Sequence, residues 1–132
     1  MRFMGLAILF GSCLACWHPR VNTILTREFH AIREITGIHL LERDYIRVHG
    51  HAGSLRQLAF PRQPLDGYFV EVIPTSKGYT IRALPQEFGV TGRRTFYSDE
   101  SGDVRESWDA QRPTDGSSSV RRSFQKSSPE SR

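Results

Sequence analysis

The side chains of this 132-residue sequence that are able to do chemistry form three small groups. These groups are Cys13 with Cys16, His49 with His51, and Asp99 and Glu100 with Asp103. A zinc centre requires three or four ligands, and no third ligand stands at suitable spacing from the histidine pair, so we expect loop histidines there. The three carboxylates offer the oxygen ligands that calcium prefers, but they lack the spacing of an EF-hand loop. We therefore expect a solvated turn at residues 99–103 and predict no metal site and no cofactor.

Nucleophilic catalysis requires a base and an orienting acid around a nucleophile. The five histidines of the sequence have no accompanying motif of that kind. The Cys-x-x-Cys spacing of Cys13 and Cys16 lies in an apolar leader, which provides no folded context for redox or metal chemistry. We therefore expect no enzyme and no catalytic residues.

The charge distribution argues against a nucleic-acid partner. The net charge is +4, but residues 111–132 carry five basic and two acidic side chains, which leaves +1 for residues 1–110. Basic and acidic residues alternate in that larger part instead of forming a basic stripe. With 38% hydrophobic residues, the chain has enough apolar side chains for one modest core, and we expect a single domain.

Residues 1–16 are expected to be a signal peptide or a short membrane anchor. Arg2 precedes an apolar run from Phe3 to Phe10, and small residues follow as far as Ala15. This apolar core has the usual length for a secretory signal and is shorter than the roughly 20 residues of a comfortable membrane span. The sequence thus predicts an exported protein, periplasmic or attached to the bacterial cell envelope through its N-terminus.

The two cysteines add lipidation to the alternatives for the N-terminus. Cleavage before Cys16 would place small residues at Ala15 and Cys13 and leave a cysteine at the new N-terminus, where bacterial lipoproteins carry their lipid. Neither Cys16 nor Cys13 stands in a full lipoprotein motif, so lipidation, simple cleavage and an uncleaved anchor all stay open.

The next segment, residues 22–48, has the pattern of one long amphipathic helix. Asn22 is a suitable N-cap, and Gly50 is suited to the turn that ends the helix. Apolar residues recur at intervals of three or four, which predicts one buried stripe with the charged residues, Glu28 and Glu42 among them, on solvated faces. The expected stripe is Leu25, Phe29, Ile32, Ile35, Ile38, Leu41, Tyr45 and Val48.

Alternating patterns after a loop at residues 49–66 predict a small sheet. Strands are expected at about 67–73, 79–84, 94–98 and 104–108, with the turn Pro74–Gly78 between the first two. Residues 111–132 are polar and rich in serine, and we expect them to be disordered. The fold class is therefore α+β: a long N-terminal helix packed on a three- to four-stranded antiparallel meander, within a domain at residues 17–110.

The segment from Gly78 to Trp108 resembles the C-terminal part of type IV pilins and type II secretion pseudopilins, especially short pilin-like proteins common in acidobacterial genomes. The likeness rests on Gly78 to Thr80, Ala83 to Pro85, Gly89 to Gly102 and Val104 to Trp108, and it covers roughly residues 22–110. Residues 1–21 lack the usual prepilin cleavage motif and its Glu.

The resemblance implies a non-catalytic, extracytoplasmic subunit or accessory protein of a type IV pilus or type II secretion-like system. Its partners would be other pilin-like or secretion-system subunits. The alternative is a small exported lipoprotein that binds a ligand or the cell envelope. The side chains that we expect to make such contacts are Arg93, Arg94, Tyr97, Asp99 and Glu100, exposed around the third strand, and Trp108 at the sheet edge. For Tyr97 and Trp108, packing against the helix is an equally open alternative.

Overall fold

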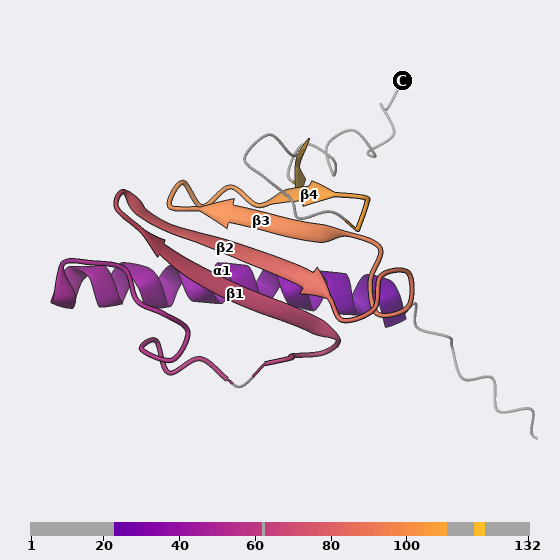
Figure 1. Ribbon diagram of the computed structural model, residues 1–132, viewed down its shortest axis with the longest axis horizontal. Coiled ribbons are helices and arrows are strands. Elements are labelled where there is room, and N and C mark those ends of the chain that lie inside the picture. The colour runs from indigo at the N-terminus through magenta and orange to yellow at the C-terminus, as the bar shows by residue number, and fades with distance from the viewer. Residues whose placement is uncertain (1–22, 62, 111–117, 121–132) are drawn as a thin grey trace, which may run out of the picture.

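One helix lies along one face of an antiparallel sheet in the computed structural model, which describes residues 23–61, 63–110 and 118–120 (Figure 1). The predicted α+β class, a helix packed on an antiparallel sheet, is confirmed. Asn22, Cys13 and Cys16 lie outside the described residues, as does the rest of segment 1–16. The elements are α1 (Thr23–His49), β1 (Tyr68–Thr75), β2 (Gly78–Pro85), β3 (Thr95–Asp99), β4 (Arg105–Ser107) and β5 (Ser118–Ser119).

The strands form a meander in the order β1-β2-β3-β4-β5, and every neighbouring pair is antiparallel. The β1–β2 hairpin is tighter than expected, because Thr75 pairs with Gly78 and only Ser76 and Lys77 connect the strands. The prediction of a turn at Pro74–Gly78 was therefore too wide. Pro74 is tolerated within β1 because β1 is an edge strand, where one row of backbone groups has no partner strand.

The buried face of α1 differs from the predicted stripe. Ile35 and Ile38 are fully buried, whereas Leu25, Phe29 and Val48 are more than half exposed. A step of three residues falls about 60° short of a full turn, so the repeated threes of the predicted stripe wind around the helix. The observed face alternates steps of three and four and thus stays on one side. It consists of Glu28, Ala31, Ile35, Ile38 and Glu42.

The core lies between this helix face and the middle of the sheet. Ile35 and Ile38 form one buried cluster with side chains of the first three strands, among them Ile81 and Phe96, each 0% exposed. Tyr68 also belongs to the cluster, and its ring lies 5.9 Å from that of Phe96. The helix and the sheet therefore share one hydrophobic core, and each depends on the other for burial of its apolar face.

Part of the C-terminal segment joins the sheet, which corrects the expectation that all of residues 111–132 are disordered. Ser118–Ser119 pair with β4, and the Val120 amide donates to the carbonyl of Val104 at 2.8 Å. Val120 is buried in the core cluster. An apolar side chain in a polar segment thus finds a place beside Val104, and its burial favours the ordered strand. Residues 111–117 and 121–132 lie outside the described part of the chain.

Among the described residues, no helix combines the length and the hydrophobicity that a membrane span requires.

Candidate functional site

The candidate site is the surface over β3, β4 and the adjoining side of α1, and at its base lies a buried ion cluster. The Arg94 guanidinium donates from Nε to Glu28 Oε2 at 2.9 Å and from Nη1 to Glu106 Oε2 at 2.7 Å. Both carboxylates are 2% exposed. Arg94, which directly precedes β3, therefore links α1 to β4 through its two ion pairs. Its guanidinium is thus occupied within the fold and is not available to contact another protein. The prediction of an exposed Arg94 was wrong, as was that of a solvated Glu28.

Further hydrogen bonds and aromatic contacts surround this cluster. The backbone amide of Arg93 donates to Glu28 Oε1 at 2.8 Å, and the Tyr68 hydroxyl donates to the carbonyl of Arg94 at 2.7 Å. The guanidinium lies 5.4 Å from the ring centroid of Phe96 and 5.3 Å from that of Trp108. Two carboxylates and two aromatic rings around one guanidinium favour its charged form. Burial by itself lowers the pKa of Arg94, but the hydrogen bonds and charges of Glu106 and Glu28 together raise it above its ordinary value.

Tyr97 is also buried, at 8% exposure, which corrects its predicted place on the contact surface. It lies in the middle of β3, opposite Arg82 on β2 and opposite Arg105 on β4. Cross-strand neighbours project from the same face of a sheet, so Arg82 and Arg105 stand on either side of Tyr97. Alternation within one strand predicts only the face on which Tyr97 lies. How far it is buried depends on the two neighbouring strands, so the sequence pattern did not predict it.

Trp108 and Arg93 remain exposed and define the outer part of the site. Trp108 is 66% exposed, and it lines a pocket of about 160 Å³ with Leu25 and Arg93. Leu25 and Phe29 on α1 are 54% and 57% exposed. Phe29 lies four residues after Leu25 and therefore on the same side of the helix. We call Trp108, Arg93, Leu25 and Phe29 the Trp108 surface. It presents three large apolar side chains and one cation at the junction of α1 with the end of β4.

The acidic turn between β3 and β4 is held by local hydrogen bonds. Asp99 Oδ1 accepts from the Ser101 amide at 2.9 Å, and Asp103 Oδ1 accepts from the Ser119 hydroxyl at 2.8 Å. Hydrogen bonding by Ser101 is the main cause that lowers the pKa of Asp99. Glu100 is exposed in this turn, two residues before Gly102, whose φ is +78°. In the described residues, no three His, Cys, Asp or Glu side chains are arranged to hold a metal ion.

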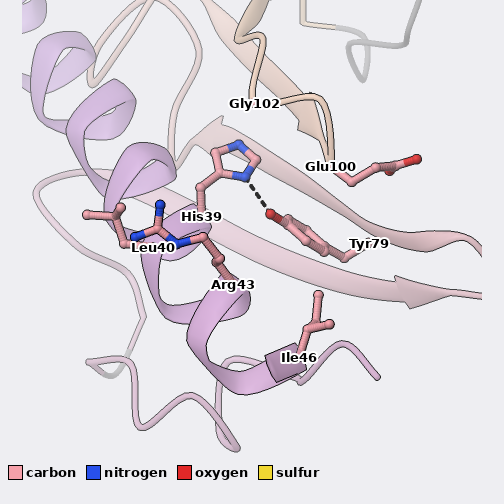
Figure 2. Close-up of a pocket in the computed structure, with 7 residues that line it drawn as sticks. All are labelled: His39, Leu40, Arg43, Ile46, Tyr79, Glu100 and Gly102. Atoms are coloured by element: carbon pink, nitrogen blue, oxygen red, sulfur yellow. Dashed lines mark hydrogen bonds between the residues drawn. The ribbon is translucent and has the colours of Figure 1, made fainter. Parts of the chain in front are cut away.

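A second pocket, of about 350 Å³, opens between α1 and this turn (Figure 2). Its wall contains His39, whose Nδ1 lies 2.7 Å from the Tyr79 hydroxyl and whose Nε2 lies 2.7 Å from Ser98 Oγ. Ser98 donates its one hydroxyl hydrogen to the carbonyl of Asp103, so Nε2–H of His39 donates to Ser98. Nδ1 then accepts from Tyr79. Burial lowers the pKa of His39, against the opposing charge of Asp99, which agrees with this neutral tautomer.

The pair of Ser98 and His39 has the residue types of a nucleophile and its base, but not their arrangement. Ser98 is 0% exposed, and its hydroxyl hydrogen is donated to a backbone carbonyl, away from the imidazole. A catalytic serine must be within reach of substrate and must donate to the base. The contact therefore fixes α1 on β3.

The sequence analysis did not single out Glu28, Glu106, His39 or Ser98. Of the side chains that it expected to make contacts, Arg93, Glu100 and Trp108 are exposed. The helix pattern held one signal for the burial of Glu28 and Glu42. They lie 14 residues apart, close to four helical turns, so they share one helix face with Ile35 and Ile38. No local signal joins Arg94 to Glu106 or His39 to Ser98, because these partners belong to different elements.

Comparison of the chain with known protein families, with characterised proteins and with solved structures gives no match.

Proposed function

We propose that this chain is a non-catalytic, pilin- or pseudopilin-like subunit or accessory protein outside the cytoplasm, and that it acts by protein–protein contact through the Trp108 surface. Its partners are other pilin-like or secretion-system subunits. The proposal combines the sequence resemblance of residues 22–110 with an observed surface chemistry, the exposed apolar group formed by Trp108, Leu25 and Phe29.

The exposure of Trp108 is the observation that carries the proposal. An indole exposed by two thirds, beside the exposed Leu25 and with the exposed Phe29 one helical turn further along α1, is costly to leave in water and is typical of contact sites. Tryptophan and arginine are also the side chains that most often dominate binding energy in interfaces. The buried Arg94 cluster beneath supplies a rigid base, because Trp108 rests against its guanidinium.

The arrangement of α1 on the sheet gives weaker support. A 27-residue helix on an antiparallel meander is the architecture that the resemblance implies for the soluble half of a pilin. Architecture alone does not define function, since many unrelated activities share a fold. The Trp108 surface is therefore the part that an experiment must test.

Site-specific photo-crosslinking in the bacterium that encodes the protein tests the proposal. A photoreactive phenylalanine at Trp108 should give adducts with a pilin-like or secretion-system subunit, identified by mass spectrometry. The matched control is Ile73, which is also an exposed apolar residue but lies on β1 at the opposite edge of the sheet. Equal adducts at both positions, or none at Trp108, would contradict a specific contact there.

The intact mass of the same protein, recovered from membrane and soluble fractions, separates the subunit from the lipoprotein alternative. A diacyl or triacyl mass on Cys16 or Cys13 would support a small lipoprotein. A chain without lipid in the periplasm or inner membrane agrees with an accessory subunit, and a chain found only in the cytoplasm would refute export.

A further inference from the structure

The last strand of the sheet is a short segment from the polar C-terminal region. β5 contributes two residue pairs, Arg105 with Ser119 and Glu106 with Ser118. The Val120 amide also donates to the carbonyl of Val104, and the Ser119 hydroxyl donates to Asp103 Oδ1. β5 is thus a two-residue strand at the edge of β4, whereas the pairing of β1 with β2 extends over eight residues.

Val120 is the anchor of this segment. It is 5% exposed and belongs to the core cluster, while Val104 packs against that cluster. Residues 111–132 contain only two large apolar side chains, Val120 and Phe124. An extended segment with one apolar residue therefore fills a matching place beside β4. This is the chemistry by which a sheet edge binds a peptide strand: backbone bonds give affinity, and a pocket for one side chain gives specificity.

Release of this strand would leave most of the core in place. The remaining members of the core cluster belong to α1, the loop after it and β1 to β3, and all of them precede residue 100 in the chain. Elements with few buried contacts open at much lower free energy than the core does. The edge of β4 would then present unpaired backbone groups, which readily accept a strand from another chain.

We propose that the edge of β4 is a strand-accepting site, and that it binds residues 118–120 of a second copy of this chain in exchange for the chain's own. Every copy carries both the matching segment and the acceptor. Reciprocal exchange uses the same contacts twice and closes a symmetric dimer. The seven residues 111–117 connect Ala110 to β5 and reach at most about 27 Å when extended, which allows a crossing to an adjacent copy. The inference is independent of the pilin resemblance.

Peptide binding to the full chain tests the acceptor. In Val120→Asp, the charged side chain should leave the core and release the strand while the rest of the sheet stays folded. A synthetic peptide of residues 115–124 should then bind and protect the amides of β4 from hydrogen exchange. The chain's own strand acts at an effective concentration on the order of millimolar, so the peptide should bind wild type at least tenfold more weakly. The control peptide carries the same Val120→Asp change and should not bind.

The oligomeric state tests the exchange. Sedimentation of the wild-type chain at rising concentration should show dimers, and Val120→Asp should remove them. Val120→Pro is the second variant, because it removes the amide that donates to Val104 without introducing charge. A wild-type chain that stays monomeric up to about 1 mM, where the effective concentration of the tethered strand lies, would overturn the proposal. So would a dimer that persists in both variants.

Loss of the folded sheet in both variants would also overturn it, because residues 118–120 would then be an inseparable part of the core. Failure of the folded Val120→Asp chain to bind the wild-type peptide would likewise overturn the proposal.

Discussion

Arg94 shows how this protein tolerates buried charge. Its guanidinium satisfies two carboxylates at once, and the Arg93 amide completes the shell of Glu28. Removal of the cation would leave two buried carboxylates, Glu28 and Glu106, without their counter-charge. A buried cluster of this type contributes little when intact and costs much when broken, because desolvation of the remaining charges is no longer compensated.

Arg94→Met is therefore expected to lower the free energy of unfolding by about 3–5 kcal/mol, as measured by urea denaturation. The matched control is Arg93→Met, since the Arg93 side chain is exposed and only its backbone amide bonds to Glu28. The Arg93→Met substitution should change the free energy of unfolding by no more than about 0.5 kcal/mol. Similar losses in the two variants would show that Arg94 has no special structural role.

Glu42 is buried in a different way. It is 0% exposed, its Oε2 accepts from the Gly53 amide at 3.0 Å, and its Oε1 has no hydrogen-bond partner among the described residues. Burial raises the pKa of Glu42 above its ordinary value of 4.5, although the Gly53 bond and His51 oppose this. The folded protein therefore binds a proton at Glu42 more tightly than the unfolded chain does.

A raised pKa in the folded state gives stability that is complete below the unfolded value and decreases as the pH rises through the folded value. We expect Glu42→Gln to flatten the decline of unfolding free energy with pH above about 4.5, because glutamine cannot ionise. Urea denaturation across a pH series measures this slope. Glu87→Gln, at an exposed position, should leave the slope unchanged. A slope that is unaltered in Glu42→Gln would contradict the raised pKa.

At the scale of elements, α1 is stabilised mainly by its packing on the sheet. The helix contains Gly37 at its centre, and nothing lies within 4 Å of the place where a Cβ would stand. Glycine in a helix interior lowers stability because the unfolded chain has more conformational freedom to lose. The helix persists because Ile35 and Ile38, on either side of Gly37, are fully buried.

Gly37→Ala is expected to raise the unfolding free energy by about 0.5–1 kcal/mol and the melting temperature with it. Gly92→Ala is the matched comparison and should do the opposite. A Cβ at Gly92 would overlap the Tyr68 hydroxyl, which bonds to Arg94, so the ring must move at a cost of about 1–3 kcal/mol. Thermal denaturation of both variants measures the two signs. Destabilisation by Gly37→Ala would indicate that the helix requires a flexible centre.

At the scale of the whole molecule, helix and sheet bury their apolar faces in a single cluster. Three independent links, Glu28 with Arg94, His39 with Ser98, and Glu42 with Gly53, fasten α1 along its length. If either the helix or the sheet unfolded, the apolar face of the other would be exposed to water.

We expect one cooperative unfolding transition, in which far-UV circular dichroism of the helix and near-UV circular dichroism of the buried tyrosines have the same midpoint. Tyr68 and Tyr79 are the buried probes, since both belong to the core cluster. Two separated midpoints would show that α1 unfolds independently of the sheet.

The sequence by itself determined the element types and their order. Runs of β-branched and aromatic residues bounded by turn residues in β1 and β2, and a long run of three- and four-residue spacing in α1, are local patterns, and local patterns specify local structure. The same patterns predicted a helix on an antiparallel meander, which the structure has. Arg93 is exposed as the sequence predicted, whereas for Trp108 the sequence left packing against the helix equally open, and the structure shows that the indole is exposed.

Only the tertiary structure decided which side chains are available at the candidate site. Arg94 and Tyr97 carry polar groups and were expected to be exposed, but both are buried, and Arg94 bonds to a carboxylate on α1. Glu28 lies 66 positions from Arg94, and His39 lies 59 from Ser98. Burial of a polar side chain depends on whether packing supplies a partner for it. That partner stands on another element, so local sequence carries little information about it.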